Sequence, residues 1–302
     1  MRASQIVQDG GTRAHRLRGR MRHAPGSAAT IVAGGKDNMG TLVDYATDKG
    51  VAILTLTDPP ANTYSHEMFK ELDANILEAR FDDDVHVVVL TGHGDKYFCA
   101  GADVNMLREA DETFKYYYFL HASETLSRLE ATPKLVIAAI NGHAVRGGFE
   151  IALACDLRIA RAGALQIGLP ELALGVLPGT GGTQRLTRIV GKANAMELIV
   201  EGQTLPVEEA HAEGLVHKVW DDASHEEFMR QILEYAHEFC APSRASMAVG
   251  MVKRAIQSGG EMSLDQGLAL ERELQQQLFR SQDAKEGLIA FVQKRKPVFR
   301  GK

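Results

Sequence analysis

Two short apolar runs, each only as long as a strand, place the strongest limit on the fold. They are residues 85–91, VHVVVLT, and 135–140, LVIAAI. Runs that are continuously apolar, instead of alternating with polar residues, are typical of strands buried on both faces, as in a parallel sheet. Similar strands are predicted at 51–57, VAILTLT, and at 157–160. The sequence therefore predicts a largely buried sheet.

Helical segments separate these strands. Apolar residues recur at helical spacing over 67–80 and 113–130, and shorter helical segments are predicted at 193–201 and 207–213. Strands that alternate closely with helices predict an α/β fold.

The pattern changes after Trp220. The stretches 224–240, 243–258 and 264–292 are rich in helix formers, with an Ala-Pro break after the first and a pair of glycines before the third. We therefore predict a helical C-terminal unit.

The first 38 residues differ from the rest of the chain. They contain six arginines and no sustained apolar period, which is typical of an unpacked segment. A transit peptide and an expression leader, or an extended start upstream of Met39, are both open interpretations. We predict a disordered extension or leader at 1–38, a core at 39–238 and a helical region at 239–302.

Composition excludes several classes of protein. The net charge of -5 gives no electrostatic reason to expect a nucleic-acid partner, and the apolar runs are shorter than the roughly 20 residues of a membrane span. Three cysteines, Cys99, Cys155 and Cys240, are widely spaced and form no CxxC motif, so neither a disulfide framework nor a zinc site is expected. We predict a cytoplasmic protein, or one of the mitochondrial matrix if the extension is a transit peptide.

The segment 141–156, NGHAVRGGFEIALACD, places a carboxylate in apolar company. Two glycines precede a predicted helix, so Gly147 presents an unpaired N–H at the helix N-terminus, and Glu150 lies in the first turn. The loop 97–104, YFCAGADV, follows a buried strand and offers a similar donor at Ala102. Two such donors converging on one oxygen would form an oxyanion hole. Alternatively, the glycines serve only close packing and tight turns.

A second carboxylate, Glu171, lies in the glycine-rich segment 169–185, LPELALGVLPGTGGTQR. It is either a residue at a helix start or the partner of Glu150 in a pair that holds one water and transfers its proton. The GTGGTQR stretch lacks the ending of a nucleotide-binding P-loop, so 179–182 is interpreted as turn structure.

From about Thr41 to Lys302, the sequence resembles the enoyl-CoA hydratase/isomerase (crotonase) superfamily. The motifs that carry the resemblance are FCAGADV, NGHAVRGGFEIALACD, LPELALGVLPGTGGTQRL, VEEAHAEGLV and EGLIAFVQKRKPVF. The resemblance implies a crotonase-like spiral of ββα units followed by a helical trimerisation region. It also implies a homotrimer, or a homohexamer made of two trimers.

The same resemblance implies an enoyl-CoA hydratase, which adds water to a trans-2-enoyl-CoA to give a 3-hydroxyacyl-CoA. The matching oxyanion donors are the N–H groups of Ala102 and Gly147. Glu150 would help to activate the water that attacks C3, and Glu171 would hold that water and supply the proton to C2. The acyl-CoA is the substrate, and no metal or other cofactor is implied.

Contacts to CoA are implied for two stretches of the chain, mostly through backbone groups. The matching residues are Pro60, Ala61, Asn62, Ala100, Ala102, Asp103, Val104 and Asn105. Asp103 has an alternative role as a helix cap.

This chain departs from many relatives at Arg146, where they carry the first of three glycines. Its side chain is either exposed or in an intersubunit salt bridge, or it binds an acyl carboxylate or a CoA phosphate. The aromatic cluster at 114–119 shapes the acyl pocket or belongs to the core.

Two other functions remain open. A Δ3-Δ2 enoyl-CoA isomerase, or another acyl-CoA enzyme of the same fold, would share the enolate intermediate, but many isomerases keep only the carboxylate that matches Glu171. A noncatalytic or RNA-binding member of the fold is the second alternative, for which only the Arg-rich extension is suggestive.

Overall fold

A computed structural model describes residues 42–302 except 222 and 223, and these residues belong to one compact unit. The predicted extension at 1–38 lies outside the described residues. The predicted boundary near residue 238 stays a prediction.

The main sheet has the strand order β1-β2-β3-β5-β7-β10. Its strands are β1 Val43–Asp48, β2 Val51–Leu56, β3 Val87–Gly92, β5 Leu135–Ile140, β7 Leu157–Arg161 and β10 Lys218–Trp220. Only β1 is antiparallel to its neighbour. Strand β3 is buried at every position, which confirms the prediction of a parallel, two-sided buried sheet.

A smaller sheet has the order β4-β6-β8-β9, formed by β4 Tyr97–Cys99, β6 His143–Val145, β8 Gln166–Gly168 and β9 Thr204–Pro206. Strands β3, β5 and β7 lie in the main sheet, and the strand that follows each of them lies in the smaller one. This alternation builds the predicted ββα units. The small strands were not predicted, because three residues are too few to show a periodic pattern.

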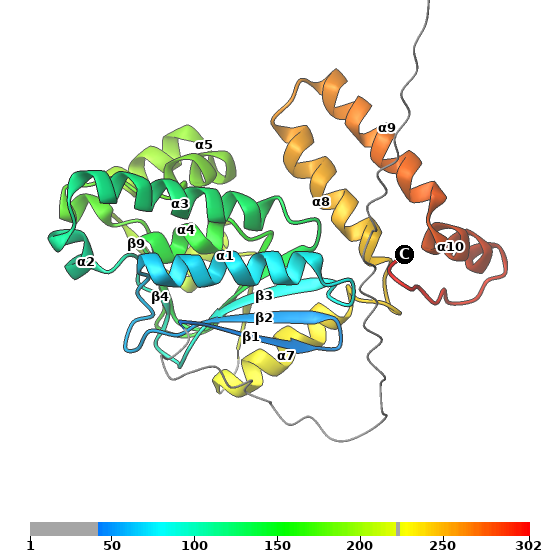
Figure 1. The fold of residues 1–302 in the computed structure, drawn as a ribbon, viewed down its shortest axis with the longest axis horizontal. Coiled ribbons are helices and arrows are strands. Elements are labelled where there is room, and N and C mark those ends of the chain that lie inside the picture. The colour runs from blue at the N-terminus through cyan, green and yellow to red at the C-terminus, as the bar shows by residue number, and fades with distance from the viewer. Residues whose placement is uncertain (1–41, 222–223) are drawn as a thin grey trace, which may run out of the picture. The chain divides into compact units, whose positions relative to one another are not determined.

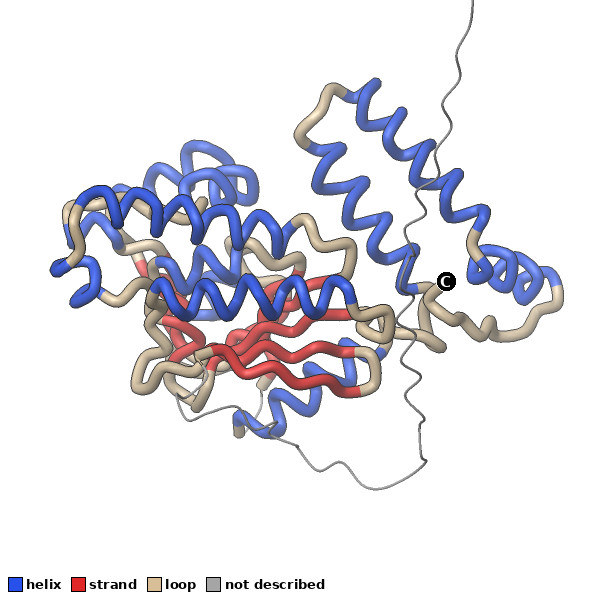
Figure 2. The backbone as a smooth tube through the Cα atoms, in the orientation of Figure 1, coloured by secondary structure: helices blue, strands red, loops and turns tan. Residues whose placement is uncertain are grey.

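Helices cover both faces of the main sheet. Figures 1 and 2 show α1, His66–Phe81, on one face and α7, His225–His237, on the other. Phe69 and Leu72 of α1 are fully buried in the larger core cluster, whereas Phe228 and Ile232 of α7 belong to a second cluster. The remaining helices before α7 are α2 Val104–Glu109, α3 Glu112–Glu130, α4 Gly147–Leu153, the 3-10 helix η1 Glu171–Leu174, α5 Gly182–Val200 and α6 Val207–Ala212.

The C-terminal region is helical, as predicted, with α8 Ser246–Gly260, α9 Leu264–Arg280 and α10 Gln282–Val292. The stretch 264–292, which is rich in helix formers, forms two helices and not one. Ser281 leaves the helical conformation at φ -69° and ψ 157°, and its hydroxyl accepts the N–H of Ala284. The buried Asp283 carboxylate then accepts the N–H groups of Arg300 and Gly301, so the end of the chain returns to the start of α10.

Two further elements differ from expectation. Strand β1 was not predicted, because only one of its six residues is buried and its pattern is mostly polar. Helix α5 begins at Gly182, well before the predicted 193, and Gly191 interrupts it with φ 79°. Among the residues described, no helix is long and apolar enough to cross a membrane.

Candidate active site

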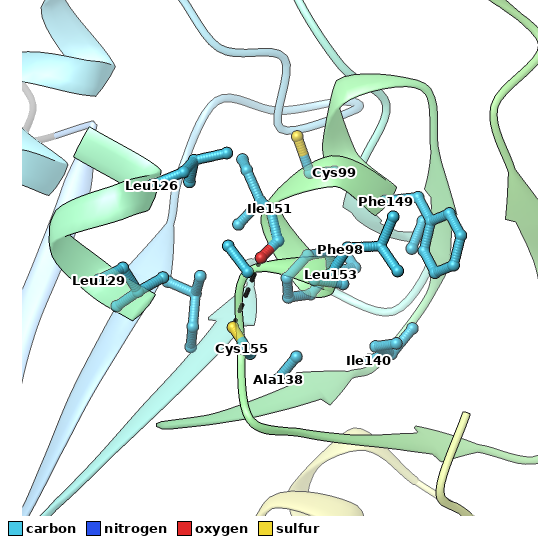
Figure 3. Close-up of a cluster of buried hydrophobic side chains, with 14 of the residues drawn as sticks. Phe98, Cys99, Leu126, Leu129, Ala138, Ile140, Phe149, Ile151, Leu153 and Cys155 are labelled. Carbon is cyan, nitrogen blue, oxygen red and sulfur yellow. Dashed lines mark hydrogen bonds between the residues drawn. The ribbon is translucent and has the colours of Figure 1, made fainter. Parts of the chain in front are cut away.

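Helix α4 carries the first carboxylate of the site. All seven of its residues are buried, and Glu150 is the one charged residue among them, with 2% of its surface exposed. Figure 3 shows Phe149, Ile151 and Leu153 of α4 within a cluster of apolar side chains from β5 and α3. This packing holds the helix that carries Glu150 in the core.

The Glu150 carboxylate has two backbone partners. Its Oε1 accepts the N–H of Thr180 at 2.8 Å and the N–H of Gly182 at 2.7 Å. These groups lie at the N-terminus of α5, where the helix dipole also favours negative charge. Arg185 fixes the loop, because its Nη1 donates to the Thr180 carbonyl at 3.0 Å and its Nη2 contacts Glu130 at 2.9 Å.

The N–H groups of Thr180 and Gly182 together form a clamp on Glu150. The sequence analysis did not predict this clamp. The interpretation of 179–182 as turn structure described the backbone but not its use as an anion site. The signal was present, since two glycines directly before a helix leave N–H groups free to bind a carboxylate.

The second carboxylate, Glu171, begins η1 and is 6% exposed. Both of its oxygens are buried and accept no hydrogen bond within the described part of the chain. Burial, followed by the nearby charge of Glu150, raises the pKa of Glu171 to about 8. Its own backbone N–H and the charge of Arg146 act in the opposite direction and lower the pKa. At neutral pH this carboxyl therefore carries a proton.

The two carboxyls differ in their surroundings. Burial raises the pKa of Glu150 as well, but hydrogen bonds from Thr180 and Gly182 and the charge of Arg185 oppose it. Glu150 has donors for its ionised form, whereas Glu171 has no donor from another residue. The donors favour the ionised form of Glu150, and the lack of an external donor favours the protonated form of Glu171.

The predicted oxyanion donors lie on adjacent stretches of backbone. A Cβ built on Gly101, which has φ 100°, would lie 3.1 Å from the Gly147 nitrogen. Neither the Ala102 N–H nor the Gly147 N–H enters a backbone hydrogen bond with the described residues. The structure thus brings both donors to the entrance of α4, close to Glu150.

The residues predicted to contact CoA also come together. The Ala100 N–H donates to the Ala61 carbonyl at 3.0 Å, which joins the turn that includes Pro60 to the loop before α2. Asn62 is 1% exposed, and its amide donates to the carbonyls of His93 and Tyr97. Its side chain therefore holds the turn, and its N–H donates to the Asp58 carbonyl at 2.7 Å.

Asp103 has the capping role that the sequence left open. Its carboxylate accepts the Asn105 N–H at 2.8 Å and so caps α2. Val104 and Asn105 are exposed in the first turn of this helix. The side chain of Asp103 is thus occupied in the structure.

A cleft of about 800 Å³ opens between α2, α3 and the loop after η1. Its wall is mainly apolar and includes Val104, Tyr116, Phe119, Leu174 and Leu177. Gly179, next to the clamp on Glu150, also lines it. Within the aromatic cluster, Tyr116 and Phe119 line the cleft, whereas Tyr118 is 1% exposed and belongs to the core.

Arg146 precedes α4 in a strained conformation, with φ 55° and ψ -138°, a region that residues other than glycine rarely occupy. Its side chain is half-buried, and its Nε is buried and makes no hydrogen bond to the described residues. Its charge opposes the rise in the Glu171 pKa.

Replacing Arg146 with glycine is expected to stabilise the fold. Relief of the strained backbone gains about 1–3 kcal/mol, whereas the greater freedom of glycine in the unfolded chain costs about 0.5–1 kcal/mol. The urea midpoint should therefore rise at an unchanged m-value. A lower midpoint would mean that contacts of the arginine outweigh the strain.

The fold is shared with known proteins. The family model for enoyl-CoA hydratase/isomerase matches residues 46–302. A relative from Bacillus subtilis, the putative enoyl-CoA hydratase/isomerase YngF, is 41% identical over 254 residues, covering 83% of this chain and 95% of the relative. The short-chain-enoyl-CoA hydratase of Clostridium acetobutylicum is 40% identical over 247 residues, covering 82% and 92%.

A solved structure agrees with these relatives. The enoyl-CoA hydratase of Geobacillus kaustophilus superposes with a TM-score of 0.83 at 42% identity, covering 88% of this chain and 98% of that one. The protein therefore has the crotonase fold. More particularly, the chain belongs to the enoyl-CoA hydratase/isomerase family and is most like an enoyl-CoA hydratase.

Proposed function

We propose that this protein is an enoyl-CoA hydratase, which adds water reversibly across the C2=C3 bond of a trans-2-enoyl-CoA to give a 3-hydroxyacyl-CoA. The observation that carries the proposal is the pair of buried carboxyls in unequal surroundings, with Glu150 held by donors and Glu171 without an external donor. The names of the relatives from Clostridium acetobutylicum and Geobacillus kaustophilus support it.

In this reaction, the thioester oxygen accepts the N–H groups of Ala102 and Gly147. These donors stabilise the enolate oxygen that develops when a nucleophile attacks C3, and one such donor typically contributes about 3–4 kcal/mol. The backbone holds both donors in place before the substrate arrives, so little reorganisation is needed during the reaction.

The two carboxyls perform the proton transfers. A water bound between them attacks C3 through its oxygen, and Glu150 accepts the proton that the water loses. The electrons of the C2=C3 bond move to the enolate, and C2 then takes the proton of Glu171. The product is the 3-hydroxyacyl thioester, and the pair returns to its starting state by exchanging a proton with solvent.

The substrate is an acyl-CoA, and the proposal invokes no metal or other cofactor. CoA would lie along the backbone of 60–62 and 100–105, and the acyl chain in the apolar cleft beside Gly179. Hydrocarbon buried there contributes about 0.8 kcal/mol for each methylene group.

Isomerisation of a 3-enoyl-CoA to the 2-enoyl-CoA is the alternative within this family. It requires one carboxyl to move a proton between C4 and C2, with the same enolate as intermediate. The retention of a second, clamped carboxylate at Glu150 favours hydration.

The assembly is proposed to be a homotrimer, or a homohexamer of two trimers. Large apolar side chains are exposed on the C-terminal helices, with Leu264 of α9 and Phe291 and Val292 of α10 each more than three-quarters exposed. Apolar surfaces of this kind are typical of interfaces between subunits. A location in the cytoplasm, or in the mitochondrial matrix if 1–38 acts as a transit peptide, stays a prediction.

The deciding experiment follows the enoyl-thioester absorbance with a series of trans-2-enoyl-CoAs that starts from crotonyl-CoA. We expect the absorbance to fall as water adds, and the product to be a 3-hydroxyacyl-CoA by mass. A parallel assay starts from a 3-enoyl-CoA and detects a rise in absorbance. Isomerisation without hydration in these assays would establish the alternative.

The hydration rate should depend on pH in a defined direction. Glu171 must carry a proton to supply C2, and its pKa is about 8. The active form is therefore present below pH 8 and lost as pH rises through this value, so kcat/KM should fall about tenfold for each further unit. A rate that stays constant up to pH 10 would exclude Glu171 as the acid.

A further inference from the structure

The charged residues that line the apolar cleft all lie at one of its ends. They are Arg108, Glu112 and Lys115, which surround the connection from α2 to α3. Only two residues separate these helices, and Figure 1 shows α2 beside the start of α3. The other lining residues carry no charge. The cleft therefore has one charged end and an uncharged remainder.

The opposite end of the cleft adjoins the candidate active site. The Ser123 hydroxyl of α3 donates to the Gly179 carbonyl at 3.4 Å. The Phe119 ring packs on the same glycine, since a Cβ built there would lie 3.0 Å from the ring. The next residue, Thr180, donates its N–H to Glu150. The end of the cleft at Ser123 is thus close to the carboxyl pair, and the charged end is farther away.

Helix α3 spans the distance between the two ends. Lys115 and Ser123 are eight residues apart, which corresponds to about 12 Å at a rise of about 1.5 Å per residue. An extended hydrocarbon chain with bonds of about 1.5 Å advances roughly 1.3 Å per bond, so about nine bonds cover this distance. The flexible lysine stem adds to its reach. An acyl chain of about ten carbons that starts beside Glu150 would therefore end near the Lys115 side chain.

Lys115 is a half-buried cation without a partner. Its ammonium forms no hydrogen bond or ion pair with the residues that the structure describes. Arg108, in contrast, pairs with Glu109 at 3.2 Å, and both side chains are more than 70% exposed. Glu112 precedes Lys115 by three residues on the same face of α3, yet the two form no ion pair. An ammonium beside an apolar wall loses part of its hydration, so an anionic partner stabilises it.

We infer that Lys115 is a specificity-determining residue: its ammonium binds a terminal carboxylate on an acyl chain of about ten carbons. Such an acyl group matches both parts of the cleft, because its methylene groups contact the apolar wall and its carboxylate meets the cation. The hydrocarbon supplies affinity, and the ion pair supplies discrimination. The inference rests on the proposed function for the thioester end of the ligand, but binding can be measured without turnover.

The first test is isothermal titration calorimetry with saturated thioesters, which have no double bond to hydrate. Decanedioyl-CoA, which has one free carboxylate, and decanoyl-CoA differ only at the far end of the chain. The Lys115→Met variant keeps an unbranched stem and lacks the charge. We expect its affinity for decanedioyl-CoA to fall about fivefold, and its affinity for decanoyl-CoA to stay within about twofold of wild type.

A shorter ligand and two further variants serve as controls. Succinyl-CoA carries its carboxylate on a chain too short to reach Lys115, so Lys115→Met should bind it as wild type does. Lys192→Met, which changes an exposed lysine of α5 outside the cleft wall, should bind both ten-carbon thioesters as wild type does.

Glu112→Gln tests the sign of the charge effect. This substitution removes an anion from the charged end, so the affinity for decanedioyl-CoA should rise while that for decanoyl-CoA stays the same. In wild type, the contribution of the carboxylate should shrink at high ionic strength, because salt screens the charge of a half-buried lysine.

The outcomes separate this inference from the proposed function. Equal changes for both ten-carbon thioesters in Lys115→Met, or no change, overturn the inference even if wild type is an efficient hydratase, since the lysine stem then only covers the apolar wall. The same loss with succinyl-CoA overturns the placement of Lys115 at the far end. A loss selective for decanedioyl-CoA supports the inference even if wild type hydrates no enoyl-CoA. If wild type binds neither ten-carbon thioester, the inference and the proposed acyl-CoA substrate are both overturned.

Discussion

The Glu171→Gln variant is expected to lose hydratase activity by about 10³-fold in kcat, because general acid catalysis typically contributes about 10²–10⁴-fold. A glutamine amide has nearly the same size as the protonated carboxyl but cannot give a proton to C2. Glu171 is already neutral near pH 7, since its pKa is about 8, so the substitution removes no buried charge and should leave the urea midpoint almost unchanged. Stopped-flow and steady-state rates with crotonyl-CoA measure the loss.

The Glu150→Gln variant separates hydration from isomerisation. We expect a comparable loss of hydration, because the amide accepts no proton from water, while any isomerisation of a 3-enoyl-CoA that uses Glu171 alone should remain. The control is Glu208→Gln, an exposed glutamate of α6, which should keep wild-type rates. Hydration at more than a tenth of the wild-type rate in both site variants would contradict the two-carboxyl mechanism.

The Gly148→Ala substitution should destabilise the fold and lower the activity through a steric clash. A Cβ at this position would lie 1.9 Å from the Cys99 carbonyl oxygen and 2.5 Å from its carbonyl carbon, both of them backbone atoms of β4. The backbone of α4 or β4 must therefore move. We expect a loss of about 3 kcal/mol or more in the free energy of unfolding, at the upper end for overpacked cores, and a large fall in activity.

A matched substitution controls for the loss of a glycine. Gly260 ends α8, and a Cβ there would meet no atom within 4 Å. The free energy of unfolding of the Gly260→Ala variant should therefore exceed that of wild type, by no more than about 1 kcal/mol. Urea denaturation of both variants gives the comparison, and equal midpoints would mean that the contact of α4 with β4 is not tight.

Regular elements were predicted where local pattern decides structure. The strand over 135–140 was predicted to the residue, and α1 and α3 within a residue at each end, because buried strands and amphipathic helices impose their period on the chain. The small strands and the break at Ser281 were not predicted. The small strands are too short to show a period, and the start of α10 also depends on distant groups, because the Asp283 carboxylate accepts the Arg300 N–H.

In the candidate site, too, local sequence patterns predicted some of the residues, whereas contacts between distant residues were not predicted. A carboxylate after two glycines indicated Glu150, and a second carboxylate in a glycine-rich segment indicated Glu171, to which the family resemblance added a role. The glycines before α5 indicated free N–H groups, but not that Glu150 would bind them, because Thr180 and Gly182 lie 30 and 32 residues after Glu150.

The sequence by itself determined the class of fold, the family and the residues that resemble its catalytic groups, since these follow from periodicity and from motifs of neighbouring residues. Tertiary structure decided how the surroundings of the two carboxyls differ. Glu150 and Glu171 are the same residue type in similar apolar company, and only folding supplies N–H donors to the first and leaves the second without an external donor. Burial and donors set a pKa through distances in space, which the order of residues along the chain does not contain.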